Sequence, residues 1–564
     1  MPELFFSLVL HAHLPFVRHP ELDESPEEDW LFEAVTEVYL PLLETLTRLT
    51  DEGLRPRLAI SLSPTLCEML ADPFLRARYT RHLDNLLALA EKELARTFRD
   101  EPQSHAAARF YHRRHRLVER LWSETYRGDI LAAFAGLRDA GSVELMTCAA
   151  THAVLPLVST EEARRAQIGV AVANHRKHFG RAPRGTWLPE CAYADDLESL
   201  LADAGLEFFV ADSRAVLHGE PRPRYGVYAP VRLAAGIAAF ARDPQTAEQV
   251  WSAEVGYPGD PAYREFYRDA GWDAPLEHLR PHLHADARRR PLGLKYHRVT
   301  GRDVRLSHKL PYDPEAAAAR AREHARHFAA SRVDQARRLR APMGSRTPLV
   351  VSPYDAELFG HWWLEGPQFI EHVFRQIHER RTEIAAVTPG DYLDSGAPLR
   401  TQRLSPSTWG DGGYLKVWLG DSNAWMYPHL HAAETRMNAL AARFADSPEA
   451  ASRSRPTSDA RPTDADEPPR GLTARALRQA ARELMLAQSS DWAFQISQNT
   501  APDYAARRFR SHLARFNALA DGIERDAIRE ARLAEIERRD NLFSEIDTGL
   551  FRASPRPGSG GAGV

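Results

Sequence analysis

The feature that most constrains the fold is an alternation of short apolar runs with long helical patterns from the N-terminus to about residue 398. Each run is bounded by turn or charged residues and has the length of a buried strand. Strands that alternate with helices favour a parallel α/β core, because parallel strands need crossover connections such as the helix expected over Pro314–Arg340. The expected strands are Leu4–Leu10, Arg57–Leu62, Val143–Thr147, Gly185–Leu188, Phe208–Ala211, Pro348–Ser352 and Ala385–Thr388.

The same pattern divides the chain into two expected domains. Residues 1–398 are predicted to form a catalytic β/α barrel, from which residues 72–137 depart as a helical excursion. Strand signals then fade, and residues 399–550 are predicted to be a helical domain. Within it, segment 446–470 lacks aromatic residues and is expected to be a flexible loop. The Gly/Ser/Pro-rich tail, residues 551–564, is expected to be disordered.

The charge balance argues against nucleic acid and membranes as partners. The 564 residues include 73 basic and 77 acidic side chains, for a net charge of −4. Such a near-neutral total provides no general attraction for a polyanion or an anionic membrane surface. No stretch of the sequence approaches the roughly 20 apolar residues that are needed to span a bilayer.

Cysteine usage and the N-terminal segment indicate a cytoplasmic protein. Cys67, Cys148 and Cys191 are too few and too scattered for a disulfide framework or a thiolate metal site. A reducing compartment is the simpler interpretation. The apolar run Leu4–Leu10 has no Lys or Arg before it and no small-residue cleavage site after it, so it is expected to be a buried strand rather than a signal peptide.

Two histidines follow the first expected strand, in His11-Ala12-His13. Residues i and i+2 of a strand point to the same face, so both imidazoles can face one site. Two functions fit this spacing: paired metal ligands, or hydrogen-bonding groups for a polyhydroxylated substrate. An ordinary structural role is the third possibility.

Two carboxylates, Glu190 and Asp355, also follow expected strands and lie among aromatic residues. An acid in such surroundings is costly unless it is paired or functional. Two carboxylates flanked by Trp and Tyr suit retaining glycoside chemistry, in which one attacks the anomeric carbon and the other moves the proton. Aromatic faces also suit the C–H faces of pyranose rings. Acids that merely cap helices after strands are the alternative.

Several long motifs occur in order along the chain. They are HAHLPFVRHPE (His11–Glu21), GSVELMTCAATHAVLPL (Gly141–Leu157), WLPECAY (Trp187–Tyr193), VWSAEVGYPGDPAYREFYRD (Val250–Asp269), SPYDAELFGHWW (Ser352–Trp363), STWGDGGYLKVWL (Ser407–Leu419), SSDWAF (Ser489–Phe494) and ERRDNLFSEID (Glu537–Asp547). Together they resemble glycoside hydrolase family 57 and, within it, the prokaryotic 1,4-α-glucan branching enzymes. The resemblance covers nearly the whole chain and implies a (β/α)7-type barrel with a helical excursion, followed by an all-α C-terminal domain.

The resemblance implies a role for particular residues. Glu190 is the expected nucleophile and Asp355 the expected general acid/base. The segment GEPRPRYG resembles a mobile loop of the family, here about residues 215–230, and places its functional tyrosine at Tyr225. The implied substrate-binding residues are His11, His13, His152, Tyr225, Arg242, Trp251, Gly256, Trp409, Trp418 and Asp491.

The implied reaction is a double displacement on an α-1,4-glucan, without a metal or an organic cofactor. If water resolves the covalent intermediate the product is hydrolytic, and if a glucan 6-hydroxyl does so the product is an α-1,6 branch in a glycogen-like polysaccharide. An α-amylase or 4-α-glucanotransferase of the same family is the nearest alternative. A metal-dependent polysaccharide deacetylase, with His11, His13 and His152 as ligands, is an alternative of another class. The protein is expected to be a monomer or a weak homo-oligomer.

Overall fold

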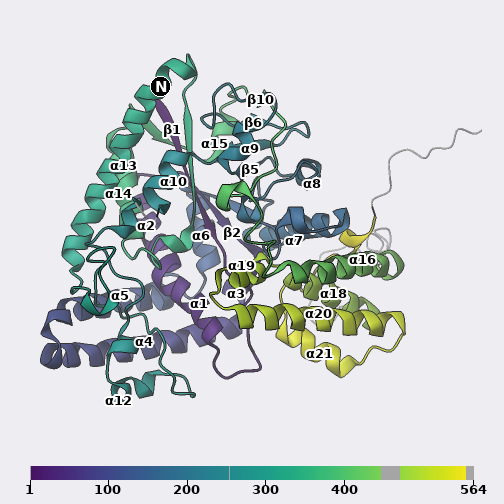
Figure 1. The fold of residues 1–564 in the computed structure, drawn as a ribbon, viewed down its shortest axis with the longest axis horizontal. Coiled ribbons are helices and arrows are strands. Elements are labelled where there is room, and N and C mark those ends of the chain that lie inside the picture. Colours follow the sequence, from purple (N-terminus) through teal and green to yellow (C-terminus); the bar gives the residue numbers. More distant parts are fainter. Residues whose placement is uncertain (1, 253–254, 446–470, 554–564) are drawn as a thin grey trace, which may run out of the picture.

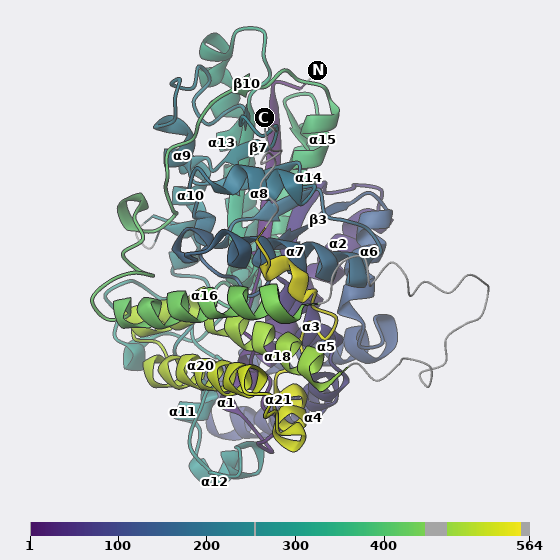
Figure 2. The same ribbon diagram turned by 90° about the vertical axis from the view of Figure 1, so that its right-hand side faces the viewer.

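The computed structural model describes residues 2–252, 255–445 and 471–553 (Figure 1). A sheet surrounded by helices forms the larger part, and a second group of helices stands against one end of it (Figures 1 and 2). The segment 446–470, predicted to be flexible, and residues 554–564 of the predicted disordered tail lie outside the described residues. Phe551 is buried in the short helix Thr548–Phe551, so ordered structure continues into the first part of that tail.

Seven parallel strands form a barrel, which confirms the predicted architecture. Neighbouring strands follow the order β7-β5-β4-β3-β2-β1-β8. The ring closes where the backbone N–H of Asp243 donates to the carbonyl of Val351 at 2.9 Å. The barrel strands are β1 (Leu4–Ala12), β2 (Leu58–Leu62), β3 (Val143–Cys148), β4 (Gly185–Trp187), β5 (Phe208–Ala211), β7 (Ala238–Ala241) and β8 (Leu349–Asp355).

Every predicted apolar run is a strand, but one of them lies outside the barrel. The run Ala385–Thr388 overlaps β9 (Ile384–Ala386), which pairs with the start of β1. The remaining barrel strand, β7, was not predicted, because its sequence AAFA is rich in alanine, a residue depleted in strands. The short strands β6 (Val231–Arg232) and β10 (Arg400–Thr401) extend the sheet beyond β7.

Helix α15 (Pro389–Asp394) closes the barrel at the amino ends of its strands, which we call the base. The backbone N–H of Gly390 donates to the Glu144 carboxylate at 2.9 Å, and a Cβ at this glycine would lie 2.3 Å from the same side chain. The ring of Tyr392 packs edge-on against the ring of Phe5, with centroids 6.1 Å apart. The other end of the barrel is therefore the end that is available for a site.

Helices on the outside of the barrel cover its strands (Figure 1). The predicted excursion is helical, and its two longest helices, α4 and α5, pack against each other. Among the described helices, none combines the length and the apolar character that a membrane crossing requires. The helices are α1 (Pro26–Ala34), α2 (Leu40–Asp51), α3 (Pro64–Ala71), α4 (Pro73–Asp100), α5 (His105–Arg120), α6 (Ile130–Asp139), α7 (Glu161–Phe179), α8 (Leu197–Asp203), α9 (Ser213–Leu217), α10 (Pro244–Trp251), α11 (Ala270–Asp273), α12 (Leu276–Leu279), α13 (Pro314–Met343) and α14 (Gly366–Glu379).

The C-terminal helices form a bundle that docks on the carboxyl ends of the strands (Figures 1 and 2). The backbone N–H of Ser490 donates to the carbonyl of His152 at 3.1 Å across this contact. The described helices of the bundle begin later than the predicted boundary at residue 399, because β10 still belongs to the sheet. They are α16 (Tyr427–Phe444), α18 (Leu472–Ala487), α19 (Ser490–Gln498), α20 (Pro502–Glu524) and α21 (Glu530–Arg539).

Candidate active site

The predicted carboxylates and histidines meet at the carboxyl ends of the barrel strands. His11 lies near the end of β1, and Asp355 is the last residue of β8. His152 follows β3, and Glu190 follows β4. This is the end of a β/α barrel at which catalytic groups gather. The neighbouring bundle supplies Asp491 at the start of α19.

Two of these side chains project from strained backbone. His152 and Glu190 have φ angles of 56° and 60°, in the left-handed region that residues with a Cβ rarely adopt. Cys191, next to Glu190, has a φ of 47°. Such conformations cost on the order of 1–3 kcal/mol each and persist where the surrounding structure holds them in place. Their concentration around one carboxylate supports a functional role for that carboxylate.

The three histidines form a packed row with fixed hydrogen bonds. The Nε2 atoms of His11 and His152 lie 3.0 Å apart, and the rings of His13 and His152 stack at 3.9 Å between centroids. His152 Nδ1 lies 2.7 Å from Ser490 Oγ. Burial holds the pKa of both His11 and His152 well below the usual value, so these two rings are neutral at pH 7. Neutral imidazoles can both donate and accept, which suits sugar hydroxyls.

Asp491 joins this row to the helical bundle. Its Oδ2 lies 3.0 Å from His13 Nε2 and also accepts a hydrogen bond from the Ser489 hydroxyl at 2.5 Å. Burial raises the pKa of Asp491, but the neighbouring His13 outweighs burial and lowers the value to about 2. Asp491 is therefore ionised at neutral pH and orients the His13 ring.

Of the two candidate catalytic carboxylates, Glu190 is the one that accepts hydrogen bonds. Trp409 Nε1 donates to its Oε2 at 2.8 Å, and the Ser490 hydroxyl lies 3.4 Å from its Oε1. Burial raises the pKa of Glu190 to about 7, against the effect of the Trp409 hydrogen bond and with the help of the negative charges of Asp355 and Asp491. A donor aimed at the carboxylate favours its ionised form, which is the form that a nucleophile needs.

Asp355 has different surroundings. Burial and the negative charge of Glu357 raise its pKa to about 7. Across the part of the chain that the structure describes, no hydrogen bond reaches its carboxylate. Asp355 thus lacks the kind of hydrogen-bond donor that favours the ionised form of Glu190. Asp355 is thus suited to the general acid and Glu190 to the nucleophile.

The contact between Trp409 and Glu190 leads to a prediction about pH. Trp409→Phe removes a hydrogen bond to the charged form, so the pKa of Glu190 rises and the acidic limb of the kcat/KM profile moves to higher pH. A shift of about one unit is expected, because a hydrogen bond to a charged group contributes about 1.5–3 kcal/mol and one pKa unit corresponds to about 1.4 kcal/mol. Trp251→Phe is the control, because Trp251 faces the Trp409 ring at 6.5 Å without bonding to Glu190. An unchanged acidic limb in Trp409→Phe contradicts the prediction.

Four residues of the site were not predicted. Glu357 accepts hydrogen bonds from the Tyr39 hydroxyl at 2.5 Å and from the backbone N–H of His13 at 3.2 Å. The ring of Trp187 stacks on His11 at 4.7 Å. Ser490 joins His152 to Glu190. Glu357, Trp187 and Ser490 lie within quoted motifs and could have been found there, whereas nothing in the sequence near Tyr39 indicates its partner.

The other residues that the resemblance implies as glucan contacts differ in their exposure and in their surroundings. Trp251 is 47% exposed and its ring is roughly parallel to that of Trp409, so this pair offers an aromatic surface beside Glu190. Arg242 forms an ion pair with the buried Asp212 at 3.1 Å, at the carboxyl end of β7. Gly256 packs closely on backbone, since a Cβ there would lie 2.3 Å from the Ser252 carbonyl oxygen. Trp418 is only 2% exposed and lies in the core beneath the Trp409 loop.

Tyr225 does not join the site. Its ring lies 5.3 Å from the Arg346 guanidinium carbon, and Arg346 in turn donates to the hydroxyl of Tyr392 in the base helix α15. The following Tyr228 carbonyl accepts from the N–H of Leu349, the first residue of β8, whereas Asp355 is the last. The length of this strand, roughly 20 Å, separates the two ends. The expected loop over the cleft is thus at the base instead, because turn-forming residues predict a loop but not the end at which it lies.

The histidines do not form one metal-ligand set of the kind that a deacetylase would use. Among the described residues, the groups with metal-ligand spacing at this site are His11 with Cys148 and His152, and His13 with His152 and Asp491. The Nε2 atoms of His11 and His152 already face each other at hydrogen-bond distance. His11, His13 and His152 lie side by side, but among the described residues the three do not form one group with metal-ligand spacing.

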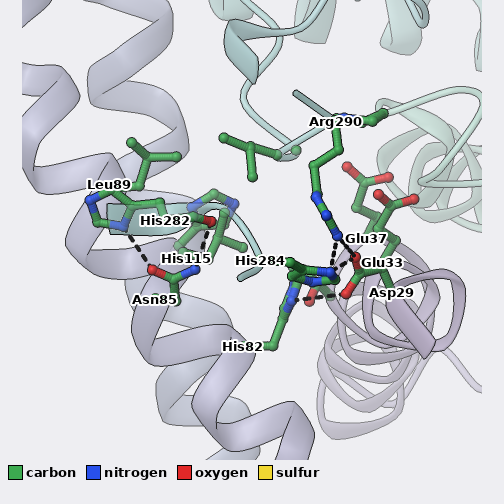
Figure 3. Close-up of a pocket in the computed structure, with 15 residues that line it drawn as sticks. Asp29, Glu33, Glu37, His82, Asn85, Leu89, His115, His282, His284 and Arg290 are labelled. Atoms are coloured by element: carbon green, nitrogen blue, oxygen red, sulfur yellow. Dashed lines mark hydrogen bonds and ion pairs between the residues drawn. The ribbon is translucent and has the colours of Figure 1, made fainter. Parts of the chain in front are cut away.

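A separate polar cavity of about 50 Å³ lies between α1, α4 and residues 282–293 (Figure 3). Asp29 contacts His284 at 3.3 Å and Arg290 at 3.7 Å. Glu37 Oε2 lies 2.7 Å from His361 Nδ1. Asp29 thus has basic partners in the cavity wall, whereas the partner of Glu37 lies behind it, and these contacts form an internal ion-pair network.

Comparison with known proteins agrees with this geometry. Residues 7–301 match the model for glycosyl hydrolase family 57, and residues 429–551 match a model described as 1,4-alpha-glucan branching enzyme, C-terminal. A 1,4-alpha-glucan branching enzyme of Thermococcus kodakarensis is 33% identical, over 98% of this chain and 79% of that protein.

Two solved structures resemble the whole chain. The alpha-amylase AmyC from Thermotoga maritima is 39% identical with a TM-score of 0.87, over 98% of this chain and 100% of that one. A GH57-type branching enzyme from Pyrococcus horikoshii is 34% identical with a TM-score of 0.83, over 99% of this chain and 98% of that one. The matched motifs, the barrel and these similarities agree, and the chain belongs to glycosyl hydrolase family 57.

Proposed function

We propose that this protein is a 1,4-α-glucan branching enzyme with Glu190 as nucleophile and Asp355 as general acid/base. In the first step a Glu190 oxygen attacks the anomeric carbon, the α-1,4 bond breaks, and Asp355 gives its proton to the departing O4. In the second step Asp355 takes the proton of a glucan 6-hydroxyl, whose oxygen displaces Glu190 and forms the α-1,6 bond. Two inversions retain the α configuration.

The remaining site residues support this chemistry without a cofactor. The neutral His11 and His152 rings and the ordered His13 can bind the hydroxyls of the sugar that reacts. Trp409 stabilises the charge that returns to Glu190 when the intermediate breaks down, because its N–H is already directed at that oxygen. The Trp251–Trp409 pair can hold a further glucose ring beside the site.

The branching assignment rests on the match of residues 429–551 to a branching-enzyme C-terminal model. This region bears on the reaction because its helix α19 supplies Ser490 and Asp491 to the site. The names of the T. kodakarensis and P. horikoshii proteins support the same reading. The name of the T. maritima structure, an alpha-amylase, makes hydrolysis the second candidate. The two reactions share the covalent intermediate and differ in the group that resolves it.

Incubation with amylose distinguishes the two functions. New α-1,6 linkages are counted by NMR, and new reducing ends are counted in the same samples. A branching enzyme forms linkages in large excess over reducing ends, because each transfer replaces one α-1,4 bond with one α-1,6 bond and creates no new reducing end. Reducing ends that outnumber α-1,6 linkages identify a hydrolase.

Trp251→Ala is expected to lower branching more than hydrolysis. The exposed face of Trp251 is available for an acceptor chain, and water needs no such surface. A loss of about tenfold in branching is expected, since stacking of this kind contributes roughly 0.5–1.5 kcal/mol beyond its area. The measurement is the ratio of α-1,6 linkages to reducing ends, with the exposed Trp272→Ala as control. A proportional fall in both products would show that Trp251 serves the donor instead.

We infer further that the protein works in the cytoplasm on a glycogen-like polysaccharide, as a monomer or weak homo-oligomer. The three cysteines are free and buried, which agrees with a reducing compartment. Recovery of the native protein outside the cytoplasm, or as a stable oligomer on gel filtration, would contradict these inferences.

A further inference from the structure

A cavity of about 260 Å³ lies at the base of the barrel, at the opposite end from Glu190 and Asp355. It is formed by the loop before β6, by β10 and the residue that follows it, Gln402, and by Arg346 just before β8. Four arginines line it: Arg222, Arg224, Arg346 and Arg400. The proposed glucan chemistry has no use for these residues.

Three of the arginines surround one tyrosine ring. The guanidinium carbons of Arg224, Arg346 and Arg400 lie 5.4, 5.3 and 6.0 Å from the centroid of Tyr225. Each gains a cation–π contact, but the three positive charges also repel one another across the ring. An arrangement of this kind is stabilised when an anion enters between the cations.

Within the described structure, the four arginines of this cavity have no acidic partner. Among the described residues that line the cavity there is no Asp or Glu, and none of the four arginines forms an ion pair with any described acid. Other arginines at the base are paired: Arg57 binds Asp391, and Arg184 lies 2.8 Å from Asp394. The arginines of this cavity thus differ from Arg57 and Arg184 in having no acidic partner.

Arg346 is the least exposed of the four and the most constrained. Its Nη2 donates to the Tyr392 hydroxyl at 3.0 Å, while its Nε is buried without a hydrogen-bond partner. A buried donor without an acceptor is costly, and an oxyanion in the cavity offers one. Guanidinium groups match phosphate geometry with paired N–H donors.

We propose that this cavity binds a small phosphate monoester, with the phosphate held by Arg224, Arg346 and Arg400. The volume is below the roughly 300–1,000 Å³ that is usual for drug-sized ligands, which favours a ligand of about the size of a sugar phosphate. The Tyr225 ring and the walls at Pro221, Pro223 and Pro230 can contact the apolar face of the ester. The site is distinct from the glucan site, so the test of this proposal does not depend on the branching activity.

Calorimetric titration of the full-length protein with glucose 6-phosphate tests the proposal. One molecule is expected to bind per chain. Arg224→Gln/Arg400→Gln removes two exposed cations of the cavity and is expected to raise the Kd at least tenfold. Arg288→Gln/Arg529→Gln removes the same charge from exposed positions elsewhere and is expected to leave the Kd within twofold of the wild-type value.

Either of two results would overturn the proposal. One is the absence of saturable binding up to about 10 mM glucose 6-phosphate, a range that includes weak metabolite sites with Kd values of about 1 mM. The other is binding with the same Kd in the Arg224→Gln/Arg400→Gln protein, which would place the ligand elsewhere. Because both arginines are exposed, an unchanged melting temperature of the unliganded variant verifies that its fold is intact.

Discussion

Glu190→Gln and Asp355→Asn are each expected to lower turnover of amylose by at least about 10³-fold, since proton transfer alone contributes about 10²–10⁴-fold. Glutamine preserves the volume of Glu190 and can still accept from Trp409 Nε1, but its amide oxygen does not form the glycosyl ester. Asparagine at residue 355 has no proton to give to the departing oxygen. Activity near the wild-type level in either variant would remove that residue from the mechanism.

An activated substrate separates the two roles. A maltosyl fluoride needs little protonation of its leaving group, so Asp355→Asn should still form the covalent glycosyl–enzyme and release it slowly. Glu190→Gln should form no adduct. Mass spectrometry of the quenched protein measures the adduct, and an adduct in Glu190→Gln would show that the nucleophile lies elsewhere.

The same variants should remain folded and gain stability at high pH. The folded-state pKa of Glu190, about 7, lies above its usual value of 4.5. Its contribution to stability is therefore fully present below about pH 4.5 and is lost as the pH rises through about 7. Glu190→Gln should melt at a higher temperature than the wild type at about pH 8 and at a similar temperature at about pH 4. A lower melting temperature at both values would indicate damage to the fold.

Asp491→Ala is expected to lower kcat/KM by about 10²-fold, the order of loss that follows from a misplacement of catalytic or positioning groups by about 1 Å. Asp491 lies 3.0 Å from His13 Nε2, and His13 stacks on His152. Removal of the carboxylate frees the His13 ring and opens the contact between α19 and the barrel. It also removes a negative charge that raises the pKa of Glu190.

The pH profile distinguishes this positioning role from simple loss of structure. In Asp491→Asn the shape is retained but the charge is lost, so the acidic limb of kcat/KM should move to lower pH, opposite to the shift in Trp409→Phe. Ser497→Ala, farther along α19 at a partly exposed position, is the matched control and should behave like the wild type. An acidic limb that stays in place in Asp491→Asn would show that Asp491 does not act on Glu190.

The bundle contributes to the site only through contacts across long separations in the sequence. His13 and Asp491 are 478 residues apart, and His152 and Ser490 are 338 apart. The resemblance of SSDWAF to a family motif indicated that Asp491 contacts glucan, but not that it binds a histidine of the first strand. Tyr39 and Glu357 are a comparable pair, with 318 residues between them.

The sequence by itself determined six of the seven barrel strands and the position of the two carboxylates after them, because both depend on local signals. An apolar run of strand length indicates a buried strand without any information from the rest of the chain. An acid directly after such a strand lies at the carboxyl end of the barrel. Tertiary structure alone decided which surface each loop and aromatic residue faces. The Gly219–Gly226 loop contains the same Pro and Gly signals at the base as it would above the cleft, and Trp418 has the same flanking residues whether it binds glucan or fills the core. Those outcomes depend on packing partners far away along the chain, which local residue patterns do not encode.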